Sequence, residues 1–219
     1  CKQTFTSFGA LCFMKTTSQT GTVRVGTFSS VAIHWLPNIV AAFQRDFPGV
    51  EYELLLGDYD EVEHWLEEGR IECGFLRLPT RPGFETIPLK KDEYKVVLPK
   101  GHPLAQYQAI DPQALNSQPF LLLERGGRTD VSDLLALFDI HTMVRFTTWE
   151  DYAILSMVEK GLGISILSQL ILQRIPYDVE IRPLSTPYYR EICLAMKDRE
   201  RLSPTAKKFL DYLPCREGR

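Results

Sequence analysis

The clearest alternation of strand-like and helix-like patterns runs through residues 22–76, which read TVRVGTFSSVAIHWLPNIVAAFQRDFPGVEYELLLGDYDEVEHWLEEGRIECGFL. Alternating valine and polar residues predict a strand at 22–27, and apolar residues at helical spacing predict a helix at 31–47. A strand at 50–56, a helix at 59–68 and a strand at 71–76 follow. This βαβαβ order predicts a parallel sheet flanked by helices, with a ligand crevice beyond the carboxyl ends of its strands.

Local signals mark the ends of these helices. Ser29 and Ser30 stand where N-caps of the first helix belong. Pro37 requires an early turn or a kink in that helix because proline has no backbone donor. Gly69 stands where a helix C-cap belongs.

A second unit with the same alternation follows a run of breakers, Pro99-Lys100-Gly101-His102-Pro103, which predicts a crossing point between two lobes. Clefts between lobes are the usual ligand sites. The other predicted elements are strands at 84–89, 92–98, 120–123, 142–146, 164–167, 179–184 and 190–196, and helices at 111–115, at 130–138 with Thr129 as cap, at 149–160 with Thr148 as cap, and from Ser203-Pro204 to Leu213.

Composition excludes several classes of protein. The 219 residues are 44% hydrophobic and 24% charged, as in ordinary globular domains, and no run of about 18 apolar residues could span a membrane. The formal net charge is -3, and residues 45–72 are strongly acidic. A solvated acidic face repels DNA, so we expect no nucleic-acid contact by this chain and no insertion into a membrane.

The five cysteines are widely and irregularly spaced, which indicates reduced thiols in a cytosolic protein. Cys73 and Cys193 lie in apolar runs, where small buried hydrophobes are expected. Cys1 leaves an alternative open, because a mature bacterial lipoprotein starts with cysteine. A secreted solute-binding lipoprotein is therefore the second hypothesis.

Motifs of catalysis are scarce. The chain has no G-x-S-x-G, H-E-x-x-H or Walker-type sequence, and its four histidines are isolated from one another. Gly161-Leu162-Gly163 follows a predicted helix rather than a strand, so it is interpreted as a helix terminator. We expect no enzyme, no metal and no cofactor. A two-lobed lyase of the prephenate-dehydratase kind is a third hypothesis, and the Thr-rich catalytic motif it requires is not found.

Small hydroxyl residues at strand-to-helix turns are the first candidates for ligand binding. Thr27, Ser29 and Ser30 follow the first strand, and Thr147 and Thr148 follow a strand of the second unit. Free N–H groups at a helix start, together with hydroxyls, can hold a carboxylate or phosphate. Simple N-capping is the alternative explanation.

Arginines at predicted strand ends are the second group of candidates. Arg77 follows the third strand, and Glu124-Arg125-Gly126-Gly127-Arg128 follows a strand of the second unit. An arginine there could bind an anionic group through two parallel hydrogen bonds, although solvated loop charges remain the alternative. We therefore predict a small ligand that bears a carboxylate.

Several local patterns together resemble the effector-binding (regulatory) domain of LysR-type transcriptional regulators, over about residues 21–213. Glu72 stands where that family usually has Asp. The residues that carry the resemblance are Gly21-x-Val23-Arg24-Val25-Gly26, Leu36-Pro37, Phe43, Phe47-Pro48-Gly49-Val50, Gly57, Leu66-Glu67-x-Gly69, Glu72-Cys73-Gly74-Phe75, Pro88-Leu89, Val96-Val97-x-Pro99, His102-Pro103-Leu104 and Val158-x-x-Gly161-Leu162-Gly163-Ile164.

The resemblance implies an α/β fold of two Rossmann-like subdomains with an inter-lobe cleft, of the type 2 periplasmic-binding-protein kind. Residues 21–98 plus 186–215 would form subdomain I and residues 99–185 subdomain II, with residues 1–20 as a linker or tail. The family's inducer contacts match Thr27, Ser29 and Ser30, and also Arg77, Glu124, Arg125, Thr147 and Thr148.

The resemblance also implies partners. A small-molecule effector would bind in the cleft, the regulatory domain would form a homodimer, and the full-length protein could be a tetramer in the cytoplasm. DNA contact belongs in this family to an N-terminal winged helix-turn-helix, which residues 1–20 do not contain. Peroxide-sensing members use a cysteine pair in the second subdomain, and that subdomain has none here.

Overall fold

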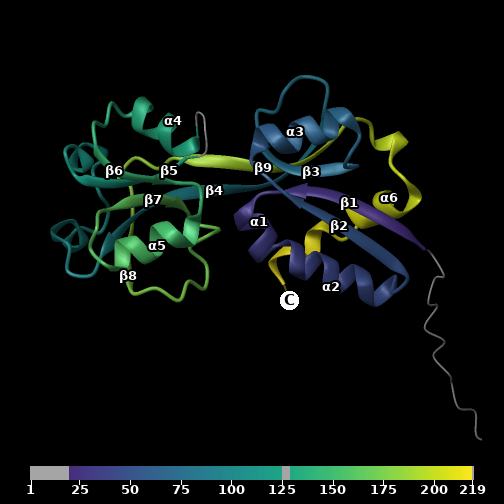
Figure 1. Cartoon of the computed structure of the whole chain (residues 1–219), viewed down its shortest axis with the longest axis horizontal. Helices are drawn as coiled ribbons and strands as arrows, with labels where there is room; N and C mark the ends of the chain where they lie inside the picture. The colour runs from purple at the N-terminus through teal and green to yellow at the C-terminus, as the bar shows by residue number, and fades with distance from the viewer. Residues whose placement is uncertain (1–19, 125–128, 219) are drawn as a thin grey trace, which may run out of the picture.

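The first lobe is built on three parallel strands covered by helices on both faces. The computed structural model describes residues 20–124 and 129–218. Strand β1 pairs in parallel with β2 and with β3, as the βαβαβ order predicts. Figure 1 shows α3 on one side of these strands and α2 on the other. The elements are β1 (Gly21–Thr27), α1 (Ser29–His34), α2 (Leu36–Asp46), β2 (Val50–Leu56), α3 (Tyr59–Glu68), β3 (Cys73–Leu78) and α6 (Pro204–Leu210).

The second lobe contains the other strand-helix alternation, which confirms the predicted α/β class. Its strands β5 and β6 are parallel neighbours, and a bridge from Phe120 to Ile164 links β5 to the segment that leads into β7. A 3₁₀ turn at Pro112–Leu115 stands where a short helix was predicted. The elements are β5 (Pro119–Leu123), α4 (Asp130–Leu137), β6 (Met143–Thr148), α5 (Asp151–Glu159), β7 (Ser165–Ser168) and β8 (Val179–Pro183).

Two long antiparallel strands, β4 (Glu85–Pro99) and β9 (Tyr189–Met196), join the lobes (Figure 1). The first part of β4 pairs with β9, and residues 94–99 pair with β7 and β8 of the second lobe. The sequence predicted two strands here, but the structure has one strand with a register shift between Pro88 and Lys90. The predicted crossing point at Pro99–Pro103 is also wrong, because the chain crosses as extended strand before it.

The helix starts differ in part from the predicted caps. The predicted helix at 31–47 is two helices that meet at Trp35, where Pro37 stands in the first turn of α2. Ser29 and Ser30 are not caps of α1, because they are its first two residues and Phe28 holds the N-cap position without a side-chain bond. Thr129 does cap α4, with Ser132 completing a capping box.

Close packing of α3 on the sheet requires small residues beneath it. A Cβ added to Gly74 would lie 2.5 Å from Cγ1 of Val62 on α3, and one added to Gly26 would lie 3.0 Å from the same atom. On the opposite face, the fully buried Trp35, Phe43, Phe75 and Phe209 belong to the main core of the first lobe. In the described part of the chain, no helix is both long and apolar enough to cross a membrane.

The predicted burial of two cysteines is confirmed. Cys73 and Cys193 are buried without a disulfide, and burial raises the pKa of each thiol to about 12. A thiol with so high a pKa is protonated at neutral pH and therefore unreactive.

Candidate functional site

A cavity of about 760 Å³ lies between the lobes. From the first lobe it is lined by the start of α1, the segment from β2 into α3, and the segment from the end of β3 to residue 81. The second lobe contributes the end of β5, the starts of α4 and α5, and one residue of β7. The crossing strands contribute Tyr94 and Arg190. The carboxyl ends of β1, β2 and β3 therefore meet the second lobe at this cavity, as the crevice rule predicts.

Arg190 of β9 lines the cavity and is only 9% exposed. Its Nη2 donates to Ser30 Oγ at 2.7 Å and to Ser168 Oγ at 2.8 Å, while Nη1 donates to the hydroxyl oxygen of Tyr59 at 2.9 Å. The guanidinium carbon also lies 4.9 Å from the ring centroid of Phe28. Arg190 thus connects α1 and α3 of the first lobe to β7 of the second.

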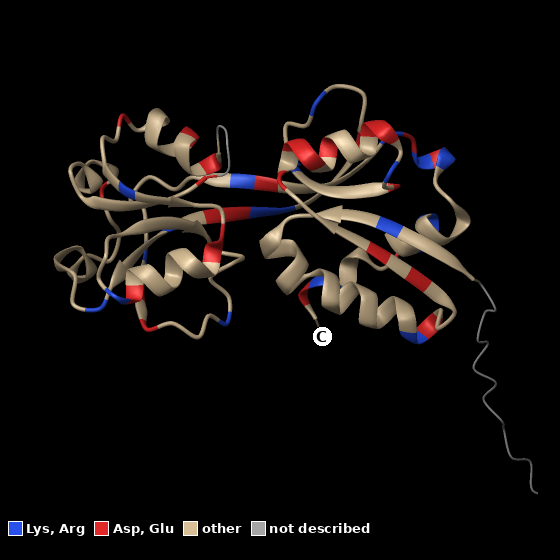
Figure 2. Ribbon diagram, viewed as in Figure 1, with Lys and Arg blue, Asp and Glu red and all other residues tan. Residues whose placement is uncertain are grey.

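Asp92 of β4 neutralises this buried arginine. Asp92 and Arg190 are directly opposite each other on the crossing strands, and Asp92 Oδ2 accepts from Nη2 at 2.7 Å and from Nε at 2.9 Å. The second oxygen, Oδ1, accepts from the backbone N–H of Leu170 at 2.9 Å. Figure 2 shows charged residues on both strands between the lobes. A buried charge is tolerated only when it is paired and hydrogen-bonded in this way.

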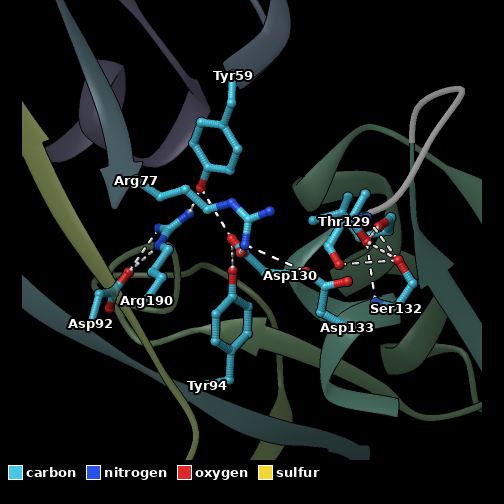
Figure 3. Close-up of polar contacts among 10 residues, drawn as sticks. Tyr59, Arg77, Asp92, Tyr94, Thr129, Asp130, Ser132, Asp133 and Arg190 are labelled. Atoms are coloured by element: carbon cyan, nitrogen blue, oxygen red, sulfur yellow. Dashed lines mark hydrogen bonds and ion pairs between the residues drawn. The ribbon is translucent and has the colours of Figure 1, made fainter. Parts of the chain in front are cut away.

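Asp130, the first residue of α4, links the second lobe to the first (Figure 3). Its Oδ1 accepts from Arg77 Nη1 at 2.6 Å, and its Oδ2 accepts from the hydroxyls of Tyr94 at 2.6 Å and Tyr59 at 3.1 Å. Arg77 Nη1 also lies 3.5 Å from Asp133 Oδ2. Burial raises the pKa of both tyrosines, so they are neutral donors at physiological pH.

Asp151, at the start of α5, makes another contact between the lobes. Burial raises the pKa of the Asp151 carboxyl, and hydrogen bonding from the side chain of Ser29 partly offsets this rise. The residue is 9% exposed and lines the cavity. The same carboxyl can therefore bind a proton or accept a hydrogen bond from a ligand.

The described part of the lining is more acidic than basic. Its three guanidinium groups are all paired with carboxylates: Arg77 with Asp130, Arg190 with Asp92, and Arg81 with Asp60 and Glu63. Glu124, Glu150 and Asp151 add further carboxylates to the wall. These described residues would repel a ligand with several negative charges.

The structure brings together four of the nine predicted site residues: Ser29, Ser30, Arg77 and Glu124 line the cavity. Thr27 is only 1% exposed and is not among the lining residues, and its hydroxyl donates to the carbonyl oxygen of Phe28. Thr147 and Thr148 are the last residues of β6 and not among the lining residues, and α5 starts after Glu150 rather than after Thr148. Arg125 and Arg128 lie outside the described residues.

Sequence reasoning missed most of the polar centre. Seven residues at the site were not predicted, although threonine cap signals precede two of them: Tyr59, Asp92, Tyr94, Asp130, Asp151, Ser168 and Arg190. One signal could have identified Asp130. Thr129 was predicted as a helix cap, and Asp130, the next residue, lies in the first helical turn, where a site at a helix start is expected. Among residues 20–124 and 129–218, no group of three His, Cys, Asp or Glu side chains is arranged to hold a metal.

Comparison with known proteins gives a consistent result. Residues 16–216 match the family model described as LysR substrate binding domain. The chain is 34% identical to the probable HTH-type transcriptional regulator LrrA of Synechococcus elongatus and 32% identical to the uncharacterized HTH-type transcriptional regulator YvbU of Bacillus subtilis. These matches cover 89% and 87% of this chain, and the chain spans 66% of the length of each relative.

The fold is similar to that of a solved regulatory domain. The regulatory domain of CcmR from Synechocystis PCC6803, described in complex with 2-PG, matches with a TM-score of 0.81 and 24% identity, over 89% of this chain and 96% of that chain. At this level of identity the likeness concerns the fold.

Proposed function

Because the chain belongs to the LysR substrate-binding domain family, we propose that its inter-lobe cavity binds a small effector that carries one carboxylate. The fold is the two-lobed, type 2 periplasmic-binding-protein kind that the resemblance implied. The alternative of a transporter's solute-binding lipoprotein is wrong, because the family match and the curated relatives are those of HTH-type transcriptional regulators.

One observation carries the proposal of a carboxylate. Arg77, Tyr59 and Tyr94 direct three donors at one point in the cavity, and a carboxylate group, that of Asp130, already satisfies all three. This donor set suits a carboxylate because an arginine combined with neutral hydroxyls supplies one positive charge and several short hydrogen bonds. The acidic remainder of the wall favours a monocarboxylate whose hydroxyl or amino groups donate to Asp151 or Glu150.

A thermal-shift screen tests this proposal. Three matched sets of small metabolites are compared: monocarboxylates, their neutral amides, and dicarboxylates or polyanions. We expect saturable stabilisation by members of the first set, and its loss in the variant Arg77→Met. Arg24→Met is the matched control, because Arg24 is also paired with a carboxylate but is half exposed on β1, away from the cavity. Stabilisation by amides or amines alone would contradict the proposal.

We propose that a pair of these domains forms the homodimer. The strands β2 and β6 each lie at an edge of their sheet, and both expose apolar side chains: Leu54 and Leu56 on β2, and Met143, Val144 and Phe146 on β6. An isologous dimer would place β2 of one protomer beside β6 of its partner, which would cover both edges.

Light scattering of the protein as it elutes from a size-exclusion column measures its mass and so tests the dimer. Phe146→Asp is expected to give monomers, because a charge would be buried in the interface. Leu137→Asp is the control, because Leu137 is 67% exposed on α4, outside both edges. An unchanged dimer in Phe146→Asp would exclude β6 from the interface.

We propose further that the domain acts in the cytoplasm without catalysis, joined in the full-length protein to a helix-turn-helix segment that contacts DNA. Effector binding would shift the populations of lobe or subunit arrangements and thereby reposition that segment. We also propose two subdomains, which the resemblance divides as residues 21–98 plus 186–215 and residues 99–185. Pairing of residues 94–99 with β7 and β8 supports moving the first boundary several residues earlier, near Asp92.

A further inference from the structure

We infer that Asp130 is an internal occupant of the effector's carboxylate subsite, so that an effector engages this subsite only by displacing the Asp130 side chain. This inference rests on the proposed function, since it assumes that the effector uses a carboxylate. It adds that the domain itself supplies a carboxylate that connects its two lobes at this subsite.

The contacts of Asp130 are those of a bound ligand. Its side chain is 6% exposed, and its two oxygens accept from three side chains on three different elements: Arg77 on β3, Tyr59 on α3 and Tyr94 on β4 (Figure 3). Arg77 and Tyr59 belong to the first lobe, whereas Asp130 is on α4 of the second. The same contacts therefore hold an anion and connect the lobes.

The local structure of α4 does not depend on this carboxylate. The N-terminus of α4 is satisfied by the capping box of Thr129 and Ser132, in which the Thr129 side chain accepts from the Ser132 N–H and the Ser132 hydroxyl accepts from the Thr129 N–H. The helix can therefore keep its start when the Asp130 side chain leaves the subsite. Arg77, with a side chain 29% exposed at the cavity, is within reach of an incoming carboxylate.

The positive charge of Arg77 is already balanced while Asp130 is in place. Its Nη1 donates to Asp130 and also lies 3.5 Å from Asp133 Oδ2, so two carboxylates already face its single positive charge, and other carboxylates line the cavity. Adding an effector carboxylate beside Asp130 would put like charges in contact at a buried site, which is strongly unfavourable. Exchange of one carboxylate for the other preserves the charge balance and all three hydrogen bonds.

Chemical rescue tests the inference directly. Asp130→Ala should leave a hole beside Arg77, Tyr59 and Tyr94 that a small carboxylate can fill. The variant is titrated with sodium acetate at constant ionic strength, with acetamide as the neutral isostere. Asp133→Ala is the matched control, because it removes a carboxylate that also faces Arg77 but leaves Asp130 in its subsite.

We expect acetate to raise the melting temperature of Asp130→Ala saturably, with a dissociation constant on the order of 1–10 mM for so small a ligand. Acetamide with this variant, and acetate with the unmodified chain or with Asp133→Ala, should give no saturable shift. Equal effects of acetate on all three proteins, or of acetamide and acetate on Asp130→Ala, would overturn the inference. So would a failure of Asp130→Ala to fold even in acetate while Asp133→Ala folds.

A second measurement separates this inference from the proposed function. The affinity of any monocarboxylate found in the screen is measured with the unmodified chain and with Asp130→Asn, which has the same size but no charge to compete for Arg77. We expect tighter binding by Asp130→Asn, by about tenfold. Equal affinities would overturn the inference and leave the proposed function intact. If acetate rescues Asp130→Ala but the screen finds no monocarboxylate effector, the carboxylate subsite is supported and the proposed function is contradicted.

Discussion

Replacing Asp92 with asparagine removes the charge that neutralises Arg190 in the centre of the molecule. The side chains of this pair are 4% and 8% exposed, and two hydrogen bonds of 2.7 and 2.9 Å join them. Arg24 and Glu53 offer a matched comparison, because they too are directly opposite on neighbouring strands and 3.0 Å apart, but their side chains are 49% and 50% exposed. The two pairs therefore differ mainly in burial.

The expected losses of stability differ accordingly. Removing one partner of a buried ion pair destabilises a protein by about 3–5 kcal/mol, because the other charge stays buried without its counterion. Arg190 keeps its bonds to Ser30, Ser168 and Tyr59 in Asp92→Asn. We therefore expect Asp92→Asn to lower the free energy of unfolding by the lower end of this range, about 3 kcal/mol. For Glu53→Gln, we expect no more than about 1 kcal/mol, as for other exposed pairs.

Urea unfolding of both variants measures these values. Circular dichroism and tryptophan fluorescence both monitor the unfolding, and their transitions should coincide. A cycle with Arg190→Met should show strong coupling, because the loss of Asp92 adds little once the guanidinium is gone. A loss below about 1 kcal/mol for Asp92→Asn, or one equal to that of Glu53→Gln, would refute the view that this buried pair holds the crossing strands together.

Three further outcomes are expected. Gly74→Ala should lower the free energy of unfolding by about 1–3 kcal/mol, since its Cβ would lie 2.5 Å from Cγ1 of Val62, and Val62→Ala should partly suppress this loss in urea unfolding. Asp151→Asn should raise the urea midpoint at pH 7. Burial raises the pKa of the Asp151 carboxyl in the folded chain, so the folded chain loses stability as the pH rises from the unfolded pKa through the folded pKa, and asparagine avoids this loss. That gain should vanish below about pH 4, where the carboxyl is protonated in both states, and a gain independent of pH would contradict a raised pKa for Asp151. Cys73 and Cys193, with pKa values raised to about 12, should not react with a thiol reagent at pH 8 until urea unfolds the chain. Reaction in the folded state would contradict their burial.

Much of the fold could be predicted from local patterns. The strand Val50–Leu56 and the helix Tyr59–Glu68 have their predicted ends, because a capping box at Asp58 and a left-handed Gly69 define the helix. The crossing strand β4 was divided wrongly at Lys90 and Lys91, since a strand between two lobes lies partly in solvent and has no regular apolar pattern. Which sheet such a strand joins depends on partners distant in sequence.

The candidate site could be predicted only in part. Residues at strand ends, such as Ser29 and Arg77, were found because the crossover rule places those ends at the crevice. The central interactions join residues far apart in the chain: Arg77 and Asp130 are separated by 53 positions, and Asp92 and Arg190 by 98. No local spacing encodes such pairs, so a buried arginine on a strand such as Arg190 carries no signal until the strands are paired.

The most direct test of the central claim is a crystal structure of the chain with a monocarboxylate found in the thermal-shift screen. We predict that the ligand lies between the lobes, that its carboxylate contacts Arg77, Tyr59 and Tyr94, and that the side chain of Asp130 has left that position. A ligand bound outside the cavity, or one whose carboxylate makes none of these contacts, would contradict the account.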